Sequence, residues 1–153
     1  MSEWKEVKIG DICKVGDGAH AKVARQEKGV LYLTAKNFEA GSLKLHDVDF
    51  ISEEDYERFF PSTSKAVTRL QLNDVLMGII GTFGNAYRYQ ETDNFGVSSS
   101  VAIIRPNSCE LNSDFLVYLL NSEKFKYVHQ AYSSGSVQGY SNIPTIKQGL
   151  LTA

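Results

Sequence analysis

The stretch from Asn73 to Tyr89 constrains the fold of this chain more than any other. It opens with an apolar segment, Val75 to Ile80, continues through glycines and an asparagine at Gly81 to Asn85, and ends in an aromatic and basic segment, Ala86 to Tyr89. Two strand-like segments joined by Gly and Asn are typical of a hairpin whose connection visits positive φ. The sequence therefore predicts a β-hairpin here, with Val75 to Ile80 in the core.

The length of 153 residues predicts a single domain with a substantial hydrophobic core. No apolar run approaches the ~18 residues that a membrane span needs. The N-terminus carries no secretory segment, so we expect a cytoplasmic protein. The two cysteines, Cys13 and Cys109, form no C-x-x-C motif, which favours reduced thiols and argues against a cysteine metal site.

The acidic residues of this chain are concentrated in one segment. The formal net charge is -2, which does not by itself indicate a nucleic-acid binder. However, residues 47–57 contain six acids and no base, so the rest of the chain is net basic. This uneven distribution permits a nucleic-acid partner on one side of the molecule without requiring one.

Short apolar segments elsewhere predict further strands. They occur at Val30 to Leu33, on both sides of His46-Asp47, and at Val97 to Ile104, whose apolar end is expected to be buried on both faces. Ala66 to Leu72 alternates and leads into the hairpin, and Gly16-Asp17-Gly18 is expected to be a turn.

Capping residues predict three helices. Ser52 begins a short helix that Pro61 ends, Asn112 begins a second, and Ser122 begins a third that runs to about Tyr132. We therefore predict a single α+β domain with a largely antiparallel, twisted sheet and a few helices, the longest of them near the C-terminus.

The chain shows no recognisable catalytic motif. His20, His46 and His129 fall in different elements without a carboxylate or cysteine at metal-ligand spacing. The glycines of the hairpin match neither a dinucleotide fingerprint nor a P-loop, and there is no nucleophile elbow. We expect no catalytic residue, no metal and no cofactor.

Several landmarks taken together resemble the target recognition domain of a type I restriction-modification specificity subunit. The most specific are N-D-V-L followed by G-T-F-G-N, and a late G-S-V-Q about fifty residues further on. The landmarks, in order, are Trp4 with Ile9 to Ile12, Leu31 to Leu33 with Lys36-Asn37-Phe38 and Gly41, Ile51 to Glu54, Asn73 to Leu76, Gly81 to Asn85, Ser98 to Pro106, Phe115 to Leu120, and Ser134 to Gln138.

This resemblance implies a non-catalytic DNA-binding component that reads one half of a bipartite target. The recognition domain would span residues 4–147, and 148–153 would be a ragged tail where the family continues into a long spacer helix. The expected partners are double-stranded DNA and the methyltransferase and restriction subunits, although docking to those subunits through such a helix is in doubt for this chain. A small RNA- or protein-binding domain, or a nuclease with an unrecognised site, remains the alternative.

The DNA contacts are expected on three exposed connections: Lys36-Asn37, the segment from Thr82 to Arg88, and the segment from Ser134 to Tyr140. Arg88 can bond guanine bidentately, and Asn85 or Gln138 can do the same with adenine. Lys36, Ser134 and Ser136 are suited to phosphate. The full set of expected contact residues is Lys36, Asn37, Thr82, Phe83, Asn85, Tyr87, Arg88, Ser134, Ser136, Gln138 and Tyr140.

Overall fold

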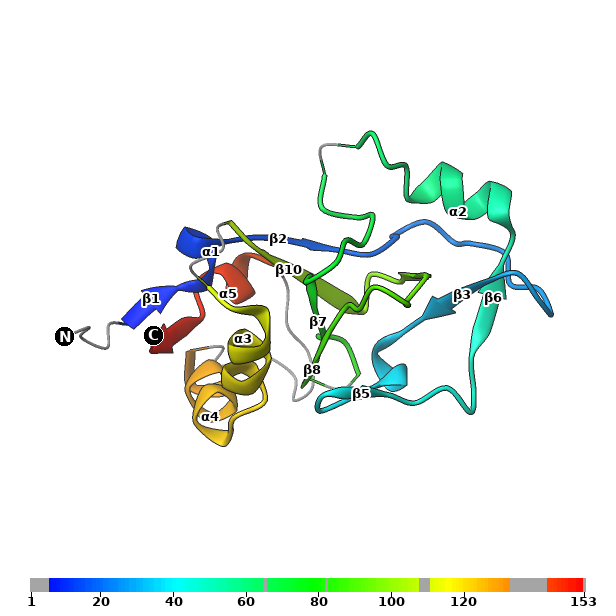
Figure 1. Cartoon of the computed structure of the whole chain (residues 1–153). Helices are drawn as coiled ribbons and strands as arrows, with labels where there is room; N and C mark the ends of the chain where they lie inside the picture. Colours follow the sequence, from blue (N-terminus) through cyan, green and yellow to red (C-terminus); the bar gives the residue numbers. More distant parts are fainter. Residues whose placement is uncertain (1–5, 65, 82, 108–110, 133–142, 153) are drawn as a thin grey trace.

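A computed structural model describes residues 6–64, 66–81, 83–107, 111–132 and 143–152. Its centre is a four-stranded antiparallel sheet (Figure 1). The strand order is β2-β10-β7-β8, which places the predicted hairpin, β7 and β8, at one side of the sheet. The strands are β2 (Cys13–Asp17), β10 (Val101–Pro106), β7 (Val75–Gly78) and β8 (Gly84–Arg88).

A second sheet lies beside the first and contains a parallel pair. The order is β6-β3-β9, where β3 runs antiparallel to β6 and parallel to β9. These strands are β3 (Val30–Leu33), β6 (Asp49–Ile51) and β9 (Phe95–Val97). Two small antiparallel ribbons complete the β-structure: β4 (Phe38–Glu39) with β5 (Ser42–Leu43), and β1 (Glu6–Lys8) with β11 (Leu150–Thr152).

The helices lie at the two ends of the molecule (Figure 1). Helix α2 lies near the second sheet, while α3, α4 and α5 gather at the end where β1 pairs with β11. The helices are α1 (Ile9–Ile12), α2 (Glu53–Phe59), α3 (Ser113–Leu120), α4 (Glu123–Tyr132) and α5 (Ile143–Lys147), with a 3-10 turn η1 (Ala35–Asn37). None of the described helices has the length and apolarity needed to span a membrane.

Strand β10 separates two hydrophobic cores. Ala102 and Ile104 face the core that α3 covers with Leu116 and Leu120, whereas Ile103 and Val101 face the core between the two sheets. The side chains of these four residues, Val101 to Ile104, are fully buried, which confirms the prediction of burial on both faces. Each large aliphatic side chain buried in this way contributes roughly 1.5–3 kcal/mol to stability.

The predicted helix starts are confirmed by their caps. The Ser52 hydroxyl accepts a hydrogen bond from the Asp55 amide at 3.0 Å, and Ser122 accepts one from Phe125 at 3.1 Å. The Asn112 side chain accepts from the amides of Asp114 and Phe115. These side chains satisfy donors that the first turn of a helix leaves unpaired, which is why the boundaries were readable from the sequence.

The predicted hairpin is also confirmed, with one exception. Its connection visits positive φ at Gly81 (87°), Gly84 (99°) and Asn85 (59°). Strand β7 and Ile79 are buried, but Ile80 is 40% exposed, so its assignment to the core was wrong. Ile80 follows Ile79, the last buried residue of this segment, and immediately precedes Gly81, where φ becomes positive.

Two predictions, one of a turn and one of a strand, were wrong. In both places the contact between two backbone segments decides the local conformation. Gly16 and Asp17 belong to β2 and pair with β10, where a turn was expected. Gly16 leaves room for the Val67 carbonyl, which would lie 2.4 Å from an added Cβ. Ala66 to Leu72, expected to alternate as a strand, instead forms bends and turns over that position.

Two further boundaries differ from the prediction. Val97 to Ile104 is not one strand, because Ser98 to Ser100 breaks it into the end of β9 and the start of β10. Residues 150–152, expected to be part of a ragged tail, form β11 and pair with Glu6 to Lys8. That pairing joins the two ends of the chain, which no local sequence pattern reveals.

Candidate nucleic-acid interface

The Lys36 turn and the start of the hairpin connection come together in space, although the described residues of the expected contact segment, Phe83 to Arg88, are not among those that line the shared surface. The turn and the start of the connection line a shallow surface hollow of about 280 Å³. Ser100 tethers both segments: its hydroxyl accepts from the Ala35 amide at 3.0 Å, and its carbonyl accepts from the Ile79 amide at 2.9 Å. The lining residues are Thr34, Ala35, Lys36, Ile80, Gly81 and Ser100.

Lys36 is the cation of this hollow. Its side chain is 54% exposed, and its Nζ lies 3.1 Å from an Asp47 carboxylate oxygen that is itself mostly exposed. An ion pair so open to solvent contributes little to folding, because water and salt screen it. The ammonium group is therefore available to exchange this carboxylate for another anion.

Asn37 lies in the interior, which corrects its assignment to the interface. The residue is 2% exposed. Its amide oxygen accepts from the Thr34 amide, and its Nδ2 donates to the carbonyls of Lys44 and Asp47 at 3.0 and 2.9 Å. Since these bonds hold the turn and the segment after β5 together, the Asn37 side chain has no access to a partner.

The described residues at the hairpin connection present less polar surface than expected. Phe83 packs against the first core and stacks with Phe125 at a ring-centre distance of 6.5 Å. Asn85 is half-buried, and its Nδ2 donates to the Phe38 carbonyl at 3.3 Å. Thr82 lies outside the described residues.

Tyr87 is buried, so its placement in the interface is corrected as well. Its hydroxyl donates to the Asp93 carboxylate at 2.6 Å. Burial, and then this hydrogen bond, raise the pKa of the Tyr87 hydroxyl above its ordinary value. The alternation of β8 explains the result: Ala86 and Tyr87 pack into cores on either side, and Arg88 follows at the strand end.

Arg88 reaches the surface at the opposite end of the hairpin from Lys36. In the β7–β8 register Arg88 pairs with Val75, whereas Gly84 pairs with Gly78 near the connection. Gly84 and Arg88 are four residue steps apart along β8, a distance of about 13 Å. The predicted contacts on the hairpin therefore form two groups, one at each end.

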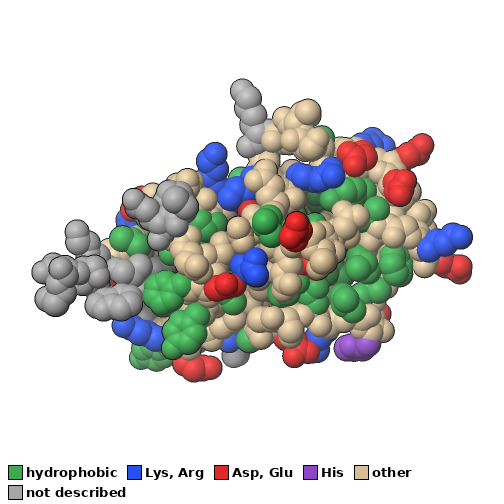
Figure 2. All heavy atoms as spheres, viewed as in Figure 1, with side chains coloured by type: hydrophobic (Ala, Val, Ile, Leu, Met, Phe, Trp, Pro, Cys, Tyr) green, Lys and Arg blue, Asp and Glu red, His purple; other side chains and the backbone are tan. Residues whose placement is uncertain are grey.

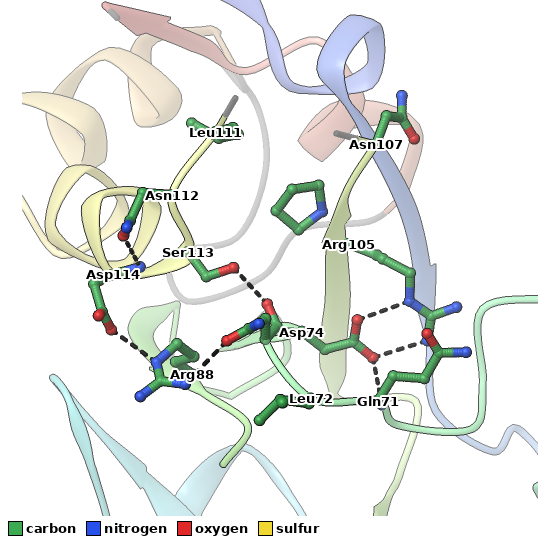
Figure 3. Close-up of a pocket in the computed structure, with 12 residues that line it drawn as sticks. Gln71, Leu72, Asp74, Arg88, Arg105, Asn107, Leu111, Asn112, Ser113 and Asp114 are labelled. Atoms are coloured by element: carbon green, nitrogen blue, oxygen red, sulfur yellow. Dashed lines mark hydrogen bonds and ion pairs between the residues drawn. The ribbon is translucent and has the colours of Figure 1, made fainter. Parts of the chain in front are cut away.

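Arg88 lines a second, larger hollow of about 600 Å³ (Figure 3). Its Nε donates to Asp114 Oδ1 at 2.8 Å and its Nη1 donates to Asn73 Oδ1 at 3.0 Å. Figure 3 shows Arg88 of β8 and Asp114 of the start of α3 pointing toward one another, and Asn73 belongs to the turn before β7. Arg105 and Asp74 form a separate ion pair in the wall of the same hollow.

Sequence reasoning missed Asn73, Ser100 and Asp114. From the sequence, Asn73 had no role beyond opening the hairpin stretch and Asp114 had none beyond following the predicted helix cap; in the structure Asn73 has a positive φ, and Asp114 lies in the first turn of α3 behind its Asn112 cap. Nothing in their spacing shows that they meet at Arg88. The expected contacts Ser134, Ser136, Gln138 and Tyr140 lie outside the described residues.

The face of the molecule shown in Figure 2 has mixed charge. Figure 2 shows Lys and Arg side chains interspersed with Asp and Glu rather than gathered into one basic patch. Hydrophobic side chains gather over α3 and α4, where Tyr118 and Tyr127 are 71% and 76% exposed. Among the residues that the structure describes, no group of three or more His, Cys, Asp or Glu is arranged to hold a metal.

The fold of this chain is that of type I restriction-modification S subunits. Three solved structures are similar: one of the complex assembly and conformational transition of a type I R-M system (14% identity, TM-score 0.63), the HsdS subunit from Thermoanaerobacter tengcongensis (15%, 0.56), and the S subunit from M. genitalium (18%, 0.64). They cover 97%, 97% and 99% of this chain, which spans only 33%, 32% and 34% of theirs. No curated protein sequence matches the chain.

The sequence itself matches a family model over residues 1–148, and the family is described as the type I restriction modification DNA specificity domain. This match extends over both hollows, the hairpin and the described helices. It confirms the resemblance drawn from the landmarks in the sequence. The chain therefore belongs to the family of type I restriction modification DNA specificity domains.

Proposed function

We propose that this chain binds double-stranded DNA and reads one half of a bipartite target, acting as the recognition component of a type I restriction-modification complex. The observation that carries the proposal is the meeting of the Lys36 turn and the hairpin connection in one exposed hollow. Two connections far apart in sequence present a cation and backbone groups on a shared surface there. This is the arrangement expected where a domain fixes its register on a phosphate backbone.

The two hollows support a division of labour. Lys36 is suited to a phosphate, because its ammonium group is exposed and held only by a screened carboxylate. Arg88 is suited to a base edge, because a guanidinium group can bond guanine bidentately. Gly84, at the connection end of β8, and Arg88 lie about 13 Å apart along the strand, which corresponds to about four base pairs of a duplex. We propose that one duplex lies along the hairpin and contacts both of its ends.

The remaining contact residues are assigned by the same logic. Asn85 lies near the connection end of β8 and has a positive φ, so we assign it to the Lys36 group; Thr82, three residues before it in the sequence, is proposed with it. Ser134, Ser136, Gln138 and Tyr140 complete the proposed set. Asn37 and Tyr87 support the surface from within, because their polar groups are already hydrogen-bonded inside the domain.

The proposed partners are the methyltransferase and restriction subunits, with the chemistry of methylation and cleavage residing in them. The proposal assigns no catalytic role to this chain and places it in the cytoplasm with its DNA. Co-purification of the chain with the methyltransferase subunit, followed by mapping of methylated sites, tests this assembly. Methylation at a defined sequence that depends on the chain is the expected result.

The DNA-binding surface is tested by selecting duplexes from a random library with the chain and titrating the enriched duplex at several salt concentrations. We expect Lys36→Ala to weaken binding and to lower the slope of log affinity against log salt by about one, as for the loss of one phosphate contact.

Lys22→Ala is the matched control, since Lys22 is exposed in the segment between β2 and β3 and lines neither hollow. Its salt slope is expected to equal that of the unmodified chain. Failure to enrich any sequence, or equal slopes for the two variants, contradicts the proposal.

A further inference from the structure

The guanidinium group of Arg88 is held from two sides. Asp114 Oδ1 accepts from Nε at 2.8 Å, and Asn73 Oδ1 accepts from Nη1 at 3.0 Å. The Arg88 side chain is 30% exposed and the Asp114 side chain is 75% exposed, so the group lies at the surface and is not sealed in the core. An exposed arginine side chain normally samples several rotamers, and two fixed acceptors remove that freedom.

Both acceptors are attached to well-anchored backbone. Asp114 lies in the first turn of α3, where its amide donates to the Asn112 cap at 2.8 Å. Asn73 has a φ of 74°, and its amide donates to the Tyr89 carbonyl at 3.1 Å. A residue other than glycine holds this conformation only where its surroundings favour it.

The two acceptors are also tied to each other. The Ser113 hydroxyl donates to the Asn73 carbonyl at 2.7 Å, which joins the first residue of α3 to the turn before β7. Three consecutive residues thus have distinct roles: Asn112 caps the helix, Ser113 fixes the turn, and Asp114 holds the arginine. The position of the guanidinium group is consequently set by α3, β8 and the turn together.

This arrangement leaves donors for a ligand. A guanidinium group has five N–H donors, and two of them are used by Asp114 and Asn73. No residue in the described part of the chain accepts a hydrogen bond from Nη2. Arg88 lines the hollow of about 600 Å³, and the N–H groups that remain on Nη1 and Nη2 are the donors it can offer to a ligand. Guanine offers two acceptors, O6 and N7, at the spacing that an arginine fork matches.

We infer that Arg88 is a preorganised reader of guanine in the major groove, and that Asp114 and Asn73 are the positioning residues that give it this specificity. The inference rests on the proposed DNA binding and adds the base and the supporting residues. Asp114 keeps its bond to Nε while the base occupies the other donors. Its carboxylate also disfavours a phosphate or a second acceptor in its place, because like charges repel.

If Asp114 only neutralised the charge of Arg88, its removal would have a different effect on DNA binding. A carboxylate that merely neutralises Arg88 would compete with DNA phosphate, and its removal would raise affinity for any duplex. A positioning carboxylate instead raises discrimination for one base. The sign of the change on removing Asp114 therefore separates the two roles.

The probe is the duplex enriched by the chain, with each guanine replaced in turn by 7-deazaguanine or by inosine. 7-Deazaguanine lacks the N7 acceptor, whereas inosine keeps both O6 and N7. We expect one guanine at which 7-deazaguanine weakens binding about fivefold or more while inosine does not. Arg88→Ala should abolish this difference, since it removes every donor that could bond N7.

The positioning residues are tested with Asp114→Asn and Asn73→Gly. The glycine variant tolerates the positive φ and removes only the side-chain acceptor. Each variant is expected to reduce the 7-deazaguanine effect at that one guanine, with affinity for a scrambled duplex changed by less than about twofold. Asp49→Asn is the matched control, because it removes the partner of Arg25 and changes the charge equally.

The outcomes distinguish a failure of the proposed DNA binding from a failure of the guanine assignment. If the chain enriches no sequence, the proposed function fails and the inference falls with it. The inference alone is overturned in three cases: the selected half-site contains no guanine sensitive to 7-deazaguanine, both positioning variants keep full discrimination, or Asp114→Asn raises affinity for the scrambled duplex more than Asp49→Asn does.

Discussion

Arg105 and Asp74 form an ion pair that joins β10 to the turn preceding β7. The Arg105 Nε and Nη2 atoms donate to the two carboxylate oxygens of Asp74 at 2.7 and 2.8 Å. Asp74 is 1% exposed and also accepts from the Gln71 amide at 2.8 Å, while Arg105 Nη2 donates to the Arg69 carbonyl. The pair fixes the turn that carries Asn73, and through it the position of Arg88.

Arg105→Leu is expected to destabilise the domain by about 3–5 kcal/mol, because it leaves a buried carboxylate without its counter-ion. Urea unfolding followed by tryptophan fluorescence or circular dichroism measures the change. Lys36→Ala is the control: it breaks an ion pair whose partners are both more than half exposed, and its cost should stay below about 1 kcal/mol. Equal costs for the two variants would show that burial of the pair is unimportant.

Asn37→Ala is expected to reduce stability by about 1–3 kcal/mol. The substitution leaves the Thr34 amide and the Lys44 and Asp47 carbonyls without their buried partner. Denaturant unfolding measures the loss, and DNA binding at low temperature should remain once the folded fraction is taken into account. A variant that folds normally but loses DNA affinity would restore Asn37 to the interface.

Stability is expected to fall at alkaline pH. Burial raises the pKa of Cys13 from 9.0 to about 12, and mainly burial raises that of Tyr89 from 10.0 to about 12. A raised folded-state pKa gives stability that is complete below the unfolded pKa and is lost as pH rises towards the folded value. The loss begins near pH 9 for the thiol and near pH 10 for the phenol, at about 1.4 kcal/mol per pH unit for each group.

Urea unfolding between pH 8 and pH 11 tests this dependence. Cys13→Ala removes the contribution of the thiol to this pH dependence. Between pH 9 and pH 10 the free energy of unfolding should therefore fall less steeply with pH in the variant than in the unmodified chain. Identical slopes would mean that the Cys13 thiol titrates equally in the folded and unfolded states.

Gly18→Ala is expected to destabilise the domain by about 3 kcal/mol or more. An added Cβ would lie 1.9 Å from the Val97 carbonyl oxygen, so two backbone segments would have to separate. Gly81→Ala is the informative comparison. That position has open space but a φ of 87°, and only the cost of the left-handed conformation applies, about 1–2 kcal/mol. Thermal unfolding of both variants should rank them in that order.

Local signals carried much of the sequence interpretation. The caps at Ser52, Asn112 and Ser122 predicted three helix starts, because a capping side chain bonds amides only two or three residues away. The hairpin was also predicted from a local signal, the Gly and Asn residues between Gly81 and Asn85, because its turn requires positive φ within a few residues. The family landmarks predicted the fold class and the membership that the family match confirms.

The sequence failed where a distant backbone or side chain decides the outcome. Gly16 looks like a turn residue, but Val67 packs against it and requires the missing Cβ. Tyr87 and Asn37 look like surface contacts, but Asp93, Lys44 and Asp47 supply the partners that allow their polar groups to be buried.

By itself, then, the sequence determined the helix caps, the hairpin and the kinds of side chain that can contact DNA. Only the tertiary structure decided which of them reach the surface and what holds them there. Arg88 was identifiable as a candidate, whereas the meeting of Asn73 and Asp114 at its guanidinium group was not. The physical reason is that capping and turn geometry act over a few residues, while Asp114 meets Arg88 only because α3 packs against β8.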